Sequence, residues 1–60
     1  MAEEFERLMA ALEPEHQAVA TLKFQGYTNR EIAAKRECAV VTVERKLNQI
    51  RKRWRKLEQT

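Results

Sequence analysis

Apolar residues recur at helical spacing along most of the chain, whereas the alternation that is typical of strands is nearly absent. Only residues 39–43 could also form a short strand. The spacing predicts four helices, at about residues 3–12, 14–25, 29–36 and 40–57. We therefore expect an all-α fold in which residues 1–60 form a single domain, because a chain of 60 residues is too short for two cores.

The first and the last predicted helices each carry one apolar stripe. The stripe of the first helix consists of Phe5, Leu8, Met9 and Leu12. The stripe of the last helix consists of Val43, Leu47, Ile50, Trp54 and Leu57. We expect both stripes to pack on the core, so that Trp54 is a core residue rather than a platform for base stacking. Recruitment of a partner by the first stripe is the alternative.

Residues that form turns and caps separate the predicted helices. Pro14 suits the first turn of the second helix, and Gly26 is expected to end that helix in a left-handed conformation. Thr28 followed by Glu31 is the pattern of a capping box at the start of the third helix. The apolar face then changes between residues 36 and 41, which predicts a break before the last helix.

A short capped helix, a turn and a longer basic helix are typical of a helix-turn-helix unit. The major groove of DNA is about 12 Å wide and accepts one α-helix, provided that a core holds the opposite face of that helix. The outer face of the last helix carries Glu44, Arg45, Asn48 and Gln49, whose side chains can bond to base edges. We interpret the fold as a small four-helix domain of the winged-helix-like DNA-binding class, without the wing.

Positive charge is concentrated in the second half of the chain. The formal net charge is +3, from 12 Lys and Arg residues against 9 acidic residues. Between positions 44 and 56, the basic residues are Arg45, Lys46, Arg51, Lys52, Arg53, Arg55 and Lys56, against a single Glu. Such a dense basic cluster suggests a polyanionic partner, with a solvated helix face as the alternative interpretation. The directed hydrogen-bonding groups within the cluster favour DNA.

Several other classes of function receive no support from the composition. A single cysteine, Cys38, excludes an internal disulfide, and with only His16 beside it we expect no metal site. We expect Cys38 to be a buried core thiol and His16 a solvated surface residue. No nucleophile–base pair or glycine-rich phosphate loop is evident, so we interpret the protein as not an enzyme and expect no cofactor.

No apolar run approaches the length of a membrane span, and the acidic start of the chain does not resemble a signal peptide. We therefore expect a cytoplasmic protein without a membrane partner. The basic amphipathic stretch 43–57 would also suit a membrane-surface or protein-interaction helix. The core needs the apolar stripe of that stretch, however, and a capped helix and turn precede it, which favours the DNA-binding interpretation.

The stretch from residue 12 to residue 54 resembles region 4 of the sigma-70 family of transcription initiation factors, above all the extracytoplasmic function (ECF) subfamily. The matching residues are Leu12, Pro14, Gly26, Thr28, Glu31, Ile32, Ala33, Thr42, Val43, Leu47 and the basic run Arg51, Lys52 and Arg53. The segment GYTNREIA also resembles the LuxR-type response-regulator domain, which binds palindromic DNA as a dimer. The segment TVERKL and the Arg-rich last helix favour the sigma factor.

The resemblance implies that the chain binds the −35 promoter element in the major groove and packs on the β flap of core RNA polymerase. It also allows an anti-sigma factor as a partner. It implies base contacts by Glu44, Arg45, Asn48 and Gln49. It implies phosphate contacts by Thr28, Arg30, Thr42 and Lys46, and the basic residues Lys52 and Arg53 extend this set.

The chain departs from the family pattern at two positions of the predicted turn and in its length. Glu37 stands where the family usually has Gly, so a positive φ there would be costly. Ala39 stands where Ser or Thr usually begins the recognition helix, and alanine cannot cap a helix. The sequence also lacks region 2, which reads the −10 element. We therefore expect either an excised C-terminal domain or a small stand-alone relative.

Overall fold

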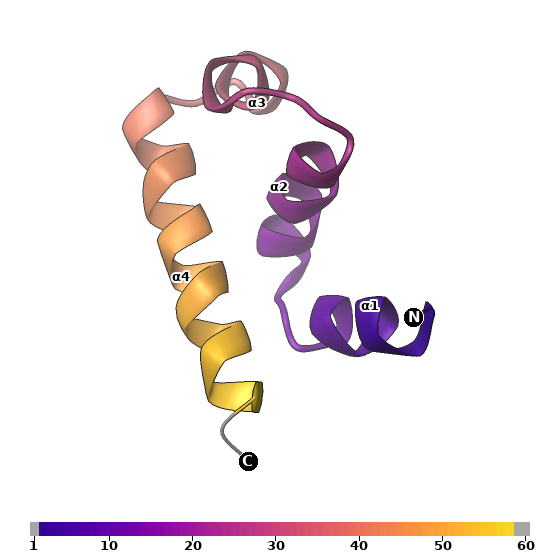
Figure 1. Cartoon of the computed structure of the whole chain (residues 1–60). Helices are drawn as coiled ribbons and strands as arrows, with labels where there is room; N and C mark the ends of the chain where they lie inside the picture. Colours follow the sequence, from indigo (N-terminus) through magenta and orange to yellow (C-terminus); the bar gives the residue numbers. More distant parts are fainter. Residues whose placement is uncertain (1, 59–60) are drawn as a thin grey trace.

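The computed structural model describes residues 2–58. These residues form four helices and no strand: α1 (Ala2–Ala10), α2 (Pro14–Phe24), α3 (Asn29–Arg36) and α4 (Val40–Glu58). In Figure 1, α4 runs along one side of the molecule, α1 and α2 lie on the other side, and α3 joins them at the end where α4 begins. The predicted all-α, four-helix fold is confirmed. The stretch 39–43, which could have been a strand, enters α4 instead.

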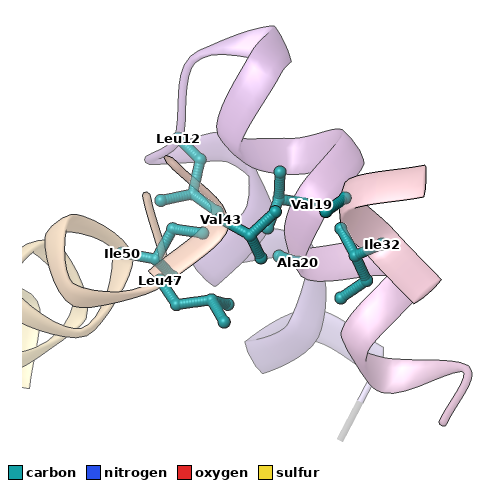
Figure 2. Close-up of a cluster of buried hydrophobic side chains, with 8 residues drawn as sticks. Leu12, Val19, Ala20, Ile32, Val43, Leu47 and Ile50 are labelled. Atoms are coloured by element: carbon teal, nitrogen blue, oxygen red, sulfur yellow. The ribbon is translucent and has the colours of Figure 1, made fainter. Parts of the chain in front are cut away.

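The core lies where α2, α3 and α4 meet, and each of these helices contributes buried apolar side chains (Figure 2). The buried residues are Leu12, Val19, Ala20, Ile32, Ala33, Val43, Leu47 and Ile50. No polar side chain is buried among the described residues. Three of the five residues predicted for the α4 stripe are therefore buried, and Trp54 packs against the same core, as expected.

Only part of the apolar stripe predicted for the first helix reaches the core. Leu12 is buried, although α1 ends at Ala10, and Met9 packs against the core. Phe5 is exposed, so the expectation is wrong for this residue: its ring lies edge-on to that of Phe24, with 5.3 Å between the centroids. Helix α1 is short and lies at the rim of the core, which leaves its first turn beyond the reach of the buried cluster.

Side chains from later in the chain bind main-chain carbonyls at the end of α1 and in the turn that follows it. The Gln17 amide donates to the carbonyl oxygens of Met9 at 2.8 Å and Leu12 at 3.0 Å. The indole nitrogen of Trp54 donates to the carbonyl oxygen of Leu8 at 2.9 Å. These bonds supply partners for carbonyl groups that a helix end leaves without intrahelical donors.

The predicted capping box at the start of α3 is confirmed, and so is the left-handed conformation predicted for Gly26 after α2. The backbone N–H of Thr28 donates to Glu31 at 2.8 Å, and the backbone N–H of Glu31 donates to the Thr28 hydroxyl at 3.2 Å, which completes the capping box. The bond from the Thr28 backbone lowers the pKa of Glu31. Before α3, Gly26 has a φ of 96°, and after it Glu37 has a φ of 54°.

Two of the single-residue expectations need correction. The His16 side chain is only 14 % exposed, and its Nε2 lies 3.5 Å from the Glu13 carboxylate, so it is not the solvated surface residue that we expected. His16 lines a depression together with Gln49 and Arg53 of α4, so α4 shields this position from solvent. Cys38 packs against the core as expected but is only half-buried.

Candidate DNA-binding surface

The buried stripe of α4 fixes which side chains of this helix point outward. Because Val43, Leu47 and Ile50 are buried, residues about half a turn away project into solvent. The four predicted base-contacting residues, Glu44, Arg45, Asn48 and Gln49, are all exposed. Together with Lys52, which is also exposed, we call them the outer face of α4.

The four residues of α4 that are predicted to contact phosphate lie in three different settings. Lys52 belongs to the outer face itself. Arg53 and Lys46 lie on one flank of α4 and are engaged within the molecule: the Arg53 Nε donates to the Ala11 carbonyl oxygen at 3.2 Å. Thr42 is half-buried in the first turn of α4, where its backbone N–H donates to the Ala39 carbonyl oxygen at 3.0 Å.

The start of α3 lies beside the other flank of the outer face. A shallow polar depression is lined by Asn29 from α3 together with Glu44, Asn48 and Arg51 from α4. Thr28 and Arg30, which stand on either side of Asn29, are exposed. The Thr28 hydroxyl accepts a bond from the Glu31 N–H through its oxygen. Its own O–H remains able to donate to a phosphate oxygen.

A cluster of charged side chains from three helices was not predicted from the sequence. The Glu15 carboxylate accepts hydrogen bonds from Lys46 Nζ at 2.8 Å and from Arg36 Nη2 at 2.7 Å. The bonds from Lys46 and Arg36 lower the pKa of Glu15. The three residues are separated by 21 and 31 positions, and no local pattern connects them.

Val41 is a second residue that the sequence interpretation did not assign to the site. Its side chain is 51 % exposed, four positions before Arg45 on the same side of α4. An exposed apolar group at this place can contact the methyl group of thymine, the apolar feature of the major groove. The signal in the sequence was an apolar residue that lies off the buried stripe.

An aromatic cluster lies away from the outer face, nearer to the C-terminal end of α4. Phe24 is 60 % exposed, and its ring centroid lies 5.3 Å from that of Phe5 and 6.1 Å from that of Trp54. Phe24 and Trp54 line an apolar pocket between α2 and α4, with the basic residues Lys23 and Arg51 beside them. Exposed aromatic groups of this kind are common in protein interfaces.

Other kinds of site are not evident in the part of the chain that the structure describes. Within residues 2–58, no group of three or more His, Cys, Asp or Glu side chains is placed to hold a metal ion. No helix over the same residues has the length and apolar character to span a membrane.

Comparison with known proteins agrees with the helix-turn-helix geometry. Searches among curated proteins and among solved structures gave no match. The model of one protein family, described as ECF sigma factor, matches residues 1–60. This match favours the sigma factor over the LuxR-type domain as the correct resemblance, and it supports DNA binding and a role in transcription initiation. The chain therefore belongs to the ECF sigma factor family.

Proposed function

We propose that this chain recognises the −35 promoter element by inserting the outer face of α4 into the major groove, as part of transcription initiation with RNA polymerase in the cytoplasm. One observation carries the proposal. Glu44, Arg45, Asn48 and Gln49 are exposed together on one face of a helix whose opposite face is buried in the core. The core thus fixes the direction in which these four side chains project.

The chemistry of the outer face suits direct base recognition. Arg45 can form a bidentate pair with guanine, Asn48 and Gln49 can do so with adenine, and Glu44 can accept a bond from the cytosine amino group. Each good pair discriminates against the wrong base by about 1–3 kcal/mol. The segment from Glu44 to Gln49 rises about 7.5 Å along the helix axis, so it can read only a few base pairs, as a short promoter element requires.

We propose that the aromatic cluster of Phe5, Phe24 and Trp54 docks on the β flap of RNA polymerase. Phe5 and Phe24 are exposed and Trp54 is half-buried, so the cluster presents an apolar surface, whereas the outer face is polar and charged. Trp54 follows Glu44 by about 15 Å along the axis of α4. This separation would allow the two surfaces to hold promoter DNA and polymerase at the same time.

Base recognition can be tested by fluorescence anisotropy with two duplexes, one that carries a −35-like site selected from a library and one with a scrambled site. We expect tighter binding to the selected site. Arg45→Ala and Gln49→Ala should lose this preference, because each removes a base contact. Arg7→Ala removes the same charge as Arg45→Ala from an exposed position on α1 and should keep the preference.

Equal binding of the parent chain to both duplexes would contradict base recognition and leave only a basic surface. The docking part is tested separately, by binding of the chain to the isolated flap region of polymerase. Phe24→Ser should weaken flap binding and leave DNA binding unchanged. Loss of both activities would instead indicate that the substitution unfolds the domain, which circular dichroism distinguishes.

A further inference from the structure

Three charged side chains from three helices converge on one side of α4. The two carboxylate oxygens of Glu15 are used separately: Oε2 accepts from Arg36 Nη2 at 2.7 Å, and Oε1 accepts from Lys46 Nζ at 2.8 Å. The Glu15 side chain is 44 % exposed, and both cations are also accessible to solvent. One anion is thus held between two cations at the protein surface.

This cluster borders the proposed base-reading surface. Lys46 directly follows Arg45 and lies one turn before Gln49, on the flank of α4 that also carries Thr42. The start of α3 lies at the opposite flank, where Asn29 approaches Glu44. A helix that lies in the major groove has a phosphate backbone along each flank, so the Arg36–Lys46 side faces one backbone and the start of α3 faces the other.

We infer that Arg36 and Lys46 form a binding site for one phosphate of the DNA backbone, and that the Glu15 carboxylate occupies this site in the free protein. The inference rests on the proposed function and adds Arg36 and Glu15 to its residues. A phosphate group presents two unesterified oxygens that can accept the same two charge-assisted bonds as the carboxylate. Binding of DNA at this point exchanges one anion for another without moving the helices.

The energetics of the cluster favour such an exchange. Ion pairs between partly exposed side chains contribute little to stability, with a median of about 0–1 kcal/mol, so their release is cheap. The bonds from Lys46 and Arg36 hold the pKa of Glu15 below its usual range, so the carboxylate stays ionised at neutral pH. Glu15 therefore competes with the phosphate under the conditions in which the domain would bind DNA, and its removal should strengthen binding.

The test measures DNA affinity as a function of salt concentration for the parent chain and for Glu15→Gln. We expect Glu15→Gln to bind several-fold more tightly at low salt. Because the parent makes the same phosphate contact once Glu15 is displaced, the slope of log affinity against log salt should be nearly equal for the two proteins. Each phosphate contact contributes about 0.9 to this slope, which is about 3.5-fold in affinity between roughly 50 and 200 mM. Glu13→Gln is the matched control, because it removes the same charge only two residues away from Glu15. The Glu13 carboxylate contacts His16 rather than Arg36 or Lys46.

Two further variants connect the effect to the cations. Lys46→Ala or Arg36→Ala, added to Glu15→Gln, should abolish the gain in affinity and make the salt slope shallower than that of the parent by up to about 0.9, and circular dichroism should show that each variant is folded. Equal gains of affinity in Glu13→Gln and Glu15→Gln, or a gain in Glu15→Gln that survives the loss of either cation, would overturn the inference, while selective binding by the parent leaves the proposed function intact. Absence of binding to any duplex by both the parent and Glu15→Gln would overturn both.

Discussion

The turn before α3 and the turn after it contain different kinds of residue. The first has Gly26 at a φ of 96° and Thr28 as a cap with reciprocal bonds to Glu31. The second has Glu37 at a φ of 54° and then Ala39, which has no side-chain oxygen for capping. The residues of the first turn prefer the conformation they adopt, whereas those of the second do not. The conformation of the second turn must therefore be imposed by contacts outside it.

The packing on either side of the second turn supplies those contacts. A left-handed conformation costs a residue other than glycine about 1–2 kcal/mol, and the lack of an N-cap costs about 1 kcal/mol. Ile32 before the turn and Val43 after it are both fully buried. Burial of each such side chain contributes about 1.5–3 kcal/mol, which is enough to offset the unfavourable turn. The start of the proposed recognition helix is thus determined by the core rather than by local sequence.

The largest effect on stability is expected from Ile32, the core residue of α3 that lies between the two turns. Ile32→Ala should destabilise the domain by about 2–5 kcal/mol, because it removes a fully buried side chain and leaves a cavity. A domain of this size has a total stability of only about 3–9 kcal/mol. Unfolding in urea, followed by circular dichroism, measures the change. Ile32→Val should cost only about 0.5–1.5 kcal/mol, and an equally small loss for Ile32→Ala would contradict the role of the core.

The same distinction between local and distant contacts explains how much of the fold and of the candidate site could be predicted from the sequence. Pro14, Gly26 and the Thr28–Glu31 box act within a few residues, so the sequence alone located the start of α2 and both ends of the first turn. The period of the α4 stripe likewise predicted which side chains face outward. These features depend on neighbours along the chain.

Contacts between distant segments left no comparable pattern in the sequence. The cluster of Glu15, Arg36 and Lys46 exists because three helices meet. Nothing in the sequence distinguishes these three charged residues from the other charged residues of the chain. The partial burial of His16 and the exposure of Phe5 depend in the same way on how α1 and α2 lie against α4. The direction of the outer face was therefore predictable, but the residues that modulate its charge were not.

A smaller effect is expected from the capping box of the first turn. Thr28→Ala should destabilise the domain by about 1 kcal/mol, because the Glu31 N–H loses its acceptor at the start of α3. Thermal unfolding followed by circular dichroism is sensitive enough, since this change lowers Tm by about 4–8 °C in a small domain. Thr21→Ala, at an exposed position inside α2, is the matched control and should not lower Tm. If the two variants lower Tm equally, the hydrogen bonds of the capping box do not stabilise the domain.

The smallest effect on stability, and the only substitution expected to raise it, concerns the second turn. Glu37→Gly should stabilise the domain by about 0.5–1 kcal/mol, because glycine adopts a positive φ without the steric cost of a side chain and this relief exceeds the extra entropy of glycine in the unfolded chain. Glu37→Ala removes the same charge but keeps the Cβ atom, so it should give no gain. Parallel thermal unfolding of both variants separates backbone strain from charge. If Glu37→Ala stabilises the domain as much as Glu37→Gly, the unfavourable feature of the second turn is the negative charge of Glu37 rather than its conformation.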